Sequence, residues 1–201
     1  GVESAAVSSG VPVGLPLVRG FVASQDSPFT ERRPGNPVQL LAGTPGLFGT
    51  LGITIQRGRD FNEADADDGV RVAIVSRSVA QLLFDSEDVV GSRFFLRRQY
   101  AVGEERRPPQ SVMIVGVSED TDVDSVHSRF MGTVYVPWAQ HYESRPSLVV
   151  RTLNENDSAV VAAIHSGIRN LAPQAAIVAE GPGRSLINSV PVVVVAWLAG
   201  T

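Results

Sequence analysis

The chain has 201 residues, of which 43% are hydrophobic and 19% charged, so it can bury a core in one domain or in two small ones. Its net charge of -4 excludes the basic surface that nucleic-acid binding requires. All 17 basic residues are arginine and there is no cysteine. P-loop NTPases and Schiff-base enzymes, which need a lysine, are therefore excluded, as are disulfides and thiolate metal sites.

The first part of the chain is predicted to supply strands to a sheet. Residues 2–8 are predicted to form a short strand, and the proline and glycine residues of segment 10–16 interrupt regular structure. Residues 25–37 are polar and rich in proline and arginine, so we expect a long loop or hairpin tip there. Residues 38–42 form a short apolar run between turn residues, which is typical of a buried strand.

The run of residues 44–84 is the most informative part of the sequence, and its motifs are structural. Thr44 is predicted to cap a helical turn that begins at Pro45, because the N–H that proline lacks would have no partner at that position. A strand-like segment, 53–55, and a turn at 58–60 follow. No residue here is a nucleophile with a base beside it, so the run predicts no active site.

A strand and a short helix are predicted in the middle of the chain. Residues 70–75 are predicted to form the strand. Ser76 is predicted to be the N-cap of a helix whose Val79, Leu82 and Leu83 share one face. A strand–helix unit is therefore expected here.

Three more strands are predicted, at residues 92–98, 111–117 and 134–136. The first two are separated by a charged tip, residues 98–109. Pro137 indicates that the third strand ends there or runs along a sheet edge.

The C-terminal part is predicted to form a β–α–β unit. A strand at residues 148–152 precedes the best helical pattern in the chain, which Asp157 opens and Pro173 stops. A strand at residues 175–179 follows. The apolar face of the helix consists of Val160, Val161, Ile164, Ile168 and Leu171.

This unit needs partner strands to complete its sheet, and residues 2–8 and 38–42 can supply them. Residues 53–138 would then be an insertion into that layer. The apolar run 190–199 has about half of the ~20 residues that a membrane-spanning helix needs. Two alternatives remain for this run: a terminal strand, or the approach to a membrane helix.

A series of short motifs occurs in a fixed order along the chain. They are Phe48-Gly-Thr-Leu-Gly-Ile53 with Arg57-Gly-Arg-Asp-Phe61, Val72-Ala-Ile-Val75 with Leu82-Leu-Phe84 and Val90-Gly91, Ile114-Val-Gly-Val117, and Val134-Tyr-Val-Pro137. Each motif alone has little specificity. In this order and spacing they resemble the extracytoplasmic core domain of MacB-type ABC transporter permeases, a group that includes FtsX and lipoprotein-release permeases.

The resemblance implies an α+β fold with two subdomains. A porter-like α/β subdomain, split in sequence, would comprise residues 1–50 and 140–182. A smaller, mostly-β subdomain of the Sabre type would be inserted as residues 51–139. Residues 183–201 would be a C-terminal tail that leads to a membrane helix or forms a terminal strand. The family usually has a helix before its opening strand, and this chain resembles the part that follows that helix.

The resemblance also implies a function. The chain would be a non-catalytic, extracytoplasmic domain of an inner-membrane permease that couples membrane-helix motion to export or to lipoprotein handling. It would act in a dimer, with a separate ATPase subunit or domain and with a periplasmic adaptor or an outer-membrane partner. A ligand-binding or sensory module of another membrane protein is the first alternative, and a hydrolase is ranked last because no nucleophile–base pair is readable.

Two acidic stretches are candidate calcium sites, because hard cations take clustered carboxylates. The first contains Asp60, Glu63, Asp65, Asp67 and Asp68, and the second spans residues 119–124. The first does not have the spacing of an EF-hand loop, and we interpret both as solvated acidic turns. No catalytic, metal or cofactor site is therefore predicted.

The remaining candidates have structural interpretations as well. His127, His141 and His165 are too scattered for a helical zinc motif. Residues 181–183, Gly-Pro-Gly, are predicted to be a loop, because Leu186 replaces the third glycine of a dinucleotide fingerprint.

Apolar side chains near loop tips are candidate anchors for a partner protein, although a place in the core is favoured. They are Phe94, Phe95, Tyr100, Phe130 and Met131. Strand alternation predicts that only one of Phe94 and Phe95 points inward.

Overall fold

The computed structural model describes residues 1–10, 18–66, 69–99, 108–121, 132–141, 146–153, 158–171, 173, 176–184 and 191–198. Its elements are β1 (Val2–Ser8), β2 (Val18–Ser24), β3 (Asn36–Gly43), α1 (Leu47–Leu51), β4 (Ile55–Gly58), β5 (Val72–Ser76), α2 (Arg77–Phe84), β6 (Arg93–Arg98), β7 (Gln110–Ser118), β8 (Thr133–Pro137), the 3-10 turn η1 (Trp138–Gln140), β9 (Ser147–Thr152), α4 (Ser158–Leu171), β10 (Ala176–Arg184) and β11 (Pro191–Leu198). The fold is a mixed, strand-rich α+β structure with few helices, as the sequence predicts.

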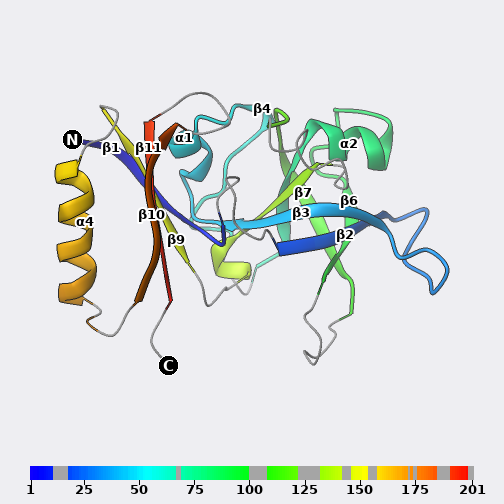
Figure 1. Ribbon diagram of the computed structural model, residues 1–201. Helices are drawn as coiled ribbons and strands as arrows, with labels where there is room; N and C mark the ends of the chain where they lie inside the picture. The colour runs from blue at the N-terminus through cyan, green and yellow to red at the C-terminus, as the bar shows by residue number, and fades with distance from the viewer. Residues whose placement is uncertain are drawn as a thin grey trace.

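The described strands form one continuous sheet in the order β10-β11-β9-β1-β3-β2-β6-β7-β5-β8, with β4 paired to β7. Because β3 also pairs in parallel with β8, the six strands from β3 to β8 in this order close into a barrel. Strands β1, β9, β10 and β11 continue the sheet outside the barrel, and we call them the open layer. Helix α4 lies beyond the open layer, on the side away from the barrel (Figure 1).

Successive side chains along the barrel strands point alternately into the barrel and out of it, and they form two separate hydrophobic cores. On β3, Leu40 and Ala42 face the barrel interior, whereas Leu41 faces outward. The interior is filled by side chains from all six strands and is covered by Val79 and Ala80 of α2. Leu82 and Leu83 pack partly against the same interior, so the predicted apolar face of this helix is confirmed.

Most strands predicted from the sequence lie within two residues of their expected bounds, but β2 was not predicted. This strand follows the interrupted segment 10–16 and pairs with β3 and β6. Its Phe21-Val-Ala23 run is short, and a strand this brief is hard to distinguish from a loop by periodicity alone.

Two predictions about the C-terminal part are settled by strand pairing. The prediction of a loop at residues 181–183 is wrong, because these residues lie within β10 and pair with residues 192–194 of β11. The run 190–199 contains a strand, β11, which lies between β9 and β10.

The predicted partners of the C-terminal unit are found, but they are not equivalent. Strand β1 pairs with β9 along its whole length, from Val2 to Ser8. Strand β3 pairs with β1 only at Ser8 and Gly43, and otherwise pairs with β2 and β8. Thus β2 and β3, which precede residue 51, pair with the block that follows it.

The prediction for Thr44 is wrong. Helix α1 begins at Leu47, and its N-cap is Gly46 in the left-handed region with φ 83°. The Thr44 hydroxyl instead accepts a hydrogen bond of 2.9 Å from the backbone N–H of Val7. Thr44 therefore connects the start of α1 to the open layer. None of the helices in the described ranges is long and apolar enough to cross a membrane.

Candidate functional site

The most distinctive site of the molecule lies where the outside of the barrel faces the open layer. Here a second core, which we call the junction cluster, combines side chains from α1 and the following turn with side chains from both parts of the sheet. Its buried members are Ala6, Leu41, Leu47, Phe48, Leu51, Ile53, Phe61, Val72, Ile74, Val115, Tyr135 and Val149. Ala6 and Val149 come from the open layer, so one apolar core holds the two parts together.

Three aromatic rings form the centre of the junction cluster. The ring of Phe48 is 4.7 Å from that of Tyr135 and 6.1 Å from that of Phe61, and both pairs meet edge to face. Such pairs contribute about 0.5–1.5 kcal/mol each beyond the area that they bury. Phe48 is 2% exposed and comes from a helix of only five residues, so this helix acts as a wedge between the barrel and the open layer (Figure 1).

Polar contacts fasten α1 to the open layer. The Thr50 hydroxyl lies 3.1 Å from the hydroxyl of Ser4 on β1. Arg151 of β9 donates a hydrogen bond of 2.9 Å to the Gly49 carbonyl and forms an ion pair of 3.2 Å with Glu3. The helix is thus bound to two strands of the open layer by side chains as well as by packing.

An arginine–aspartate pair orders the turn that leads back to the barrel. Arg59 donates two hydrogen bonds to Asp65, of 2.7 and 2.8 Å, and the Asn62 N–H donates a third of 3.0 Å to the same carboxylate. The hydrogen bond from Arg59 lowers the pKa of Asp65, and the same bond raises the pKa of Arg59. Two parallel hydrogen bonds of this kind fix the relative orientation of the two side chains as well as the distance between them.

Asp60 connects this turn to α1. Its carboxylate accepts hydrogen bonds from the N–H of Phe61, at 2.6 Å, and from the N–H of Gly46, at 3.3 Å. Burial raises the pKa of Asp60, and the two backbone hydrogen bonds oppose that rise. Asp60 and Asp65, considered above as calcium ligands and interpreted as part of a solvated turn, serve as acceptors for the protein's own donors. The solvated interpretation is wrong for Asp65, which is buried.

Close backbone contact between β4 and β7 positions this turn against the barrel. Gly58 has a φ of 75°, and a Cβ at this position would lie 2.2 Å from the Val115 carbonyl oxygen. On the opposite strand, a Cβ at Gly116 would lie 2.7 Å from the Arg59 carbonyl oxygen. Only glycine satisfies both positions, which explains the Gly58 of the sequence motif.

The second acidic stretch caps a helix. Asp120 accepts a hydrogen bond of 2.8 Å from the Ser78 N–H in the first turn of α2 and a contact of 3.2 Å from Arg77. Ser76 is at the N-cap position as predicted, but its side chain makes no cap bond. Its hydroxyl accepts a hydrogen bond from the Thr133 N–H instead. Asp120, which lies in a segment distant in sequence, therefore caps α2 in place of Ser76.

The other candidates are distributed over the molecule. Phe94 is fully buried in the barrel interior and Phe95 is half-buried on the opposite face of β6, so the predicted alternation is confirmed. His141 follows the 3-10 turn η1, whereas His165 lies on α4. Within the described residues, no three Asp, Glu or His side chains are placed to hold a metal ion. Asp67, Asp68, Tyr100, residues 122–124, His127, Phe130, Met131 and Leu186 lie outside those residues.

These contacts define a structural domain whose polar side chains are used for capping and bracing. The model of the MacB-like periplasmic core domain family matches residues 3–170, so the chain belongs to this family. It is an extracytoplasmic domain of a MacB-like ABC transporter permease, in a family whose members are generally non-catalytic. Membership of such a permease family implies partnership with an ATPase component.

One solved structure shows a similar fold, and two others give lower scores. The periplasmic region of MacB from Actinobacillus actinomycetemcomitans is similar with a TM-score of 0.54 and 16% identity, over 85% of this chain and 67% of that one. A domain of a putative permease from Porphyromonas gingivalis gives 0.48 and 16%, over 85% and 70%. The extracellular domain of the noncanonic ABC-type transporter YknZ from Gram-positive bacteria gives 0.46 and 18%, over 83% and 78%. No curated protein matches the chain.

Proposed function

We propose that this chain transmits ATP-driven movement of the permease's membrane helices to the extracytoplasmic side, and that it does so without catalysis. The single observation that carries the proposal is the junction cluster, in which Ala6 and Val149 of the open layer share one core with barrel residues. A displacement of the open layer would be passed to the barrel as a unit, because a packed core is stiff.

The proposed division into subdomains is compatible with this function. We keep residues 1–50 with 140–182 and residues 51–139 as two functional parts, with two refinements. Strands β2 and β3 are better grouped with the barrel, because they pair with β6 and β8. Within segment 183–201, strand β11 is better grouped with the open layer, because it pairs with β9.

Distance measurements in the full permease test this proposal. The chain lacks cysteine, so spin labels can be attached at introduced cysteines without removing natural ones. Glu31→Cys and Arg169→Cys place labels on exposed positions of the β2–β3 loop and of α4, at opposite ends of the domain (Figure 1). For rigid transmission we expect this distance to stay constant between the nucleotide-free and ATP-bound permease, while a distance from the domain to a membrane helix or to the second copy changes.

A variant with a weakened junction supplies the control. Phe48→Ala removes the central ring of the junction cluster. We expect this variant to broaden the distribution of distances between the two labels, and to reduce transport while ATP hydrolysis continues. A nucleotide-dependent change in the distance within the unaltered domain would contradict rigid transmission.

We also propose that the domain works in a dimeric permease of the inner membrane with an adaptor or an outer-membrane partner. Family membership supports this proposal, because the ATPase partner is a property of the family. Crosslinking of the full permease in membranes tests the dimer. The family assignment favours this function over a sensory module on an unrelated membrane protein.

A further inference from the structure

A groove of about 440 Å³ lies between the β2–β3 loop and α2, at the end of the barrel farthest from α4 (Figure 1). Its apolar part consists of Val22, Ala23, Leu82 and Leu83. Val22 and Ala23 are buried barrel residues, and the two leucines are the half-buried side of α2. The apolar surface that a ligand can touch is therefore mainly that of Leu82 and Leu83, because Val22 and Ala23 are almost completely buried.

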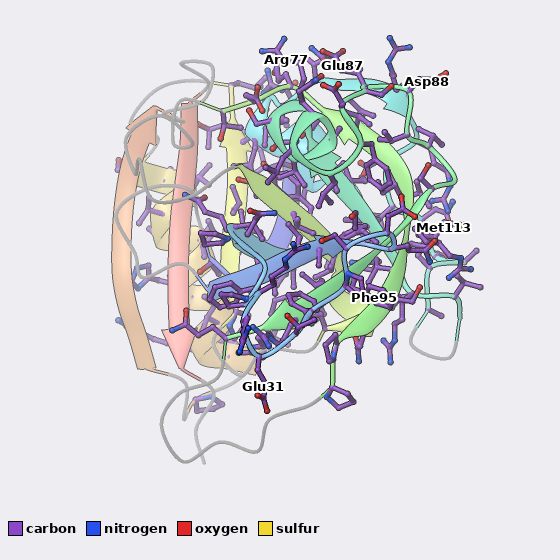
Figure 2. The ribbon with its side chains drawn as sticks, turned by 90° about the vertical axis from the view of Figure 1, so that its right-hand side faces the viewer. Glu31, Arg77, Glu87, Asp88, Phe95 and Met113 are labelled. Atoms are coloured by element: carbon purple, nitrogen blue, oxygen red, sulfur yellow. The ribbon has the colours of Figure 1, made fainter. Side chains whose placement is uncertain are left out.

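The charge of the groove is opposite to that of the whole chain. Its lining includes Arg32 and Arg33 but no acidic residue, whereas the chain carries a net charge of -4. Arg32 makes no hydrogen bond or ion pair within the described residues. Glu31, the neighbouring acidic residue, points away from α2 (Figure 2). An anion that entered this groove would meet guanidinium groups without displacing an internal carboxylate.

The loop that carries these arginines is braced. Arg97 of β6 lies between the rings of Phe21 and Phe29, with its guanidinium carbon 5.4 and 4.6 Å from the two ring centres. The same guanidinium donates a hydrogen bond of 2.7 Å to the Pro34 carbonyl. Arg33 donates a hydrogen bond of 2.9 Å to the Ser27 hydroxyl. A preformed loop lowers the entropy that binding would cost.

We propose that this groove binds a short segment of a partner protein that presents a carboxylate beside an aliphatic side chain. Guanidinium groups recognise carboxylates in a planar, bidentate geometry, and Leu82 and Leu83 can contact the aliphatic side chain. The volume suits a few residues, since it falls in the range of about 300–1,000 Å³ found for ligand sites. The groove is open to solvent, whereas a free small molecule is usually enclosed on most of its surface, so a segment of a larger protein suits it better.

Peptide binding to the isolated 201-residue chain tests the proposal and does not depend on the transport function. The probe is a fluorescein-labelled peptide containing Leu-Glu-Leu-Asp, and its control contains Leu-Gln-Leu-Asn. We expect saturable binding of the acidic peptide, about tenfold tighter than that of the amide peptide and weaker at high salt. In NMR spectra of the complex, amide shifts are expected to cluster at residues 22–36 and 82–83.

Arg32→Ser is the decisive variant, because Arg32 supports no other contact of the described loop. We expect it to weaken binding of the acidic peptide about five- to tenfold without changing the melting temperature. Arg169→Ser removes an exposed arginine of α4 at the far end of the domain and is expected to change neither quantity. Arg33→Ser is a second test, with melting measured to detect loss of its contact with Ser27.

Several results would overturn the proposal. They are equal affinity for the acidic and amide peptides, wild-type affinity in Arg32→Ser, or shifts that fall away from the groove. Glutarate that binds as tightly as the peptide would identify a small-molecule site instead. Displacement of the peptide by inorganic phosphate at lower concentration than by glutarate would identify a general anion site.

Discussion

Helices α1 and α4 show opposite relations between length and burial. Helix α1 has five residues, and Leu47, Phe48, Thr50 and Leu51 are all buried. Helix α4 has fourteen residues, yet Val160 is the buried one and Leu171 is 90% exposed. Apolar residues at helical spacing predict that a helix forms. How much that helix stabilises the fold depends instead on how many of its side chains are buried by neighbouring elements.

The largest expected effect comes from the centre of α1. Phe48→Ala should lower the free energy of unfolding by about 3–5 kcal/mol, because it leaves a cavity among buried rings. Urea unfolding followed by circular dichroism measures this change. Leu171→Ala in α4 is the matched control, with an expected change below about 0.5 kcal/mol. A larger effect of Leu171→Ala would reverse the comparison.

The next effect tests how the turn after α1 is fixed. Gly58→Ala places a methyl group against the Val115 carbonyl and forces an alanine to adopt a φ of 75°. We expect a loss of about 2–4 kcal/mol. Gly46→Ala provides the comparison, because Gly46 has a similar φ of 83° but open space around its Cβ position. We expect Gly46→Ala to lower the free energy of unfolding by less than Gly58→Ala does. Equal losses would show that the close contact of Gly58 with β7 contributes nothing to stability.

The arginine–aspartate pair should contribute less than the apolar wedge. Arg59→Ala leaves the buried Asp65 carboxylate with fewer donors, at a cost of about 1–3 kcal/mol. The lower half of this range is favoured because the Arg59 side chain is 44% exposed and is screened by water. Arg57→Ala, an exposed neighbour on β4, should have almost no effect in the same unfolding experiment.

The same pair predicts a dependence on pH. The folded-state pKa of Asp65 is lowered by Arg59, so its contribution to stability is present above the unfolded pKa of about 3.9 and is lost as pH falls below it. The stability difference between the unaltered chain and Asp65→Asn should therefore shrink on acidification from about pH 6 to about pH 3. Burial raises the pKa of Asp60 and the Asp65 charge adds to that rise, so the comparison is made in two chains that both carry Asp60→Asn. A difference that is constant over this range would contradict the assigned pairing.

The smallest effect concerns the attachment of α4 to the open layer. Val160→Ala should cost about 1–2 kcal/mol, because two buried methyl groups are removed. Ala162→Ser, at an exposed position of the same helix, is the control and should be nearly neutral. Hydrogen exchange is expected to be faster in α4 than in the barrel strands. If α4 were as protected as β5, its packing would be tighter than its burial indicates.

The sequence predicted most of the strands and the family, because their signals are local. Runs such as 72–75 and 134–136 are apolar and end at recognisable residues. The barrel was not predicted, because its closure depends on pairing between β3 and β8, which are about ninety residues apart in the chain. No local pattern records which distant strand pairs with which.

The candidate site was predicted only in part, for the same reason. The sequence identified residues 44–84 as structural, but it assigned Thr44 to a helix cap. Thr44 bonds to Val7, a partner 37 residues away, and Asp120 caps a helix 42 residues away. The groove at Arg32 and Arg33 likewise needs α2, which the sequence places fifty residues later.

The pairing of β3 with β8 and of β1 with β9 has a consequence for how this chain acquires its structure. Gln39 must meet Thr133, and Ala5 must meet Val150, so β1 and the outer edge of β3 lack these partners until most of the chain is present, although β2 and β3 can pair locally. Contacts so distant in sequence slow folding, since the entropy of closing long loops is lost before the contacts form. A chain delivered from its N-terminus across a membrane could pair β2 with β3 early, but β1 would lack β9 and β3 would lack β8 for most of its passage. Holdase chaperones outside the cytoplasm are therefore expected to raise the yield of this domain more than they would for a helical bundle of equal length.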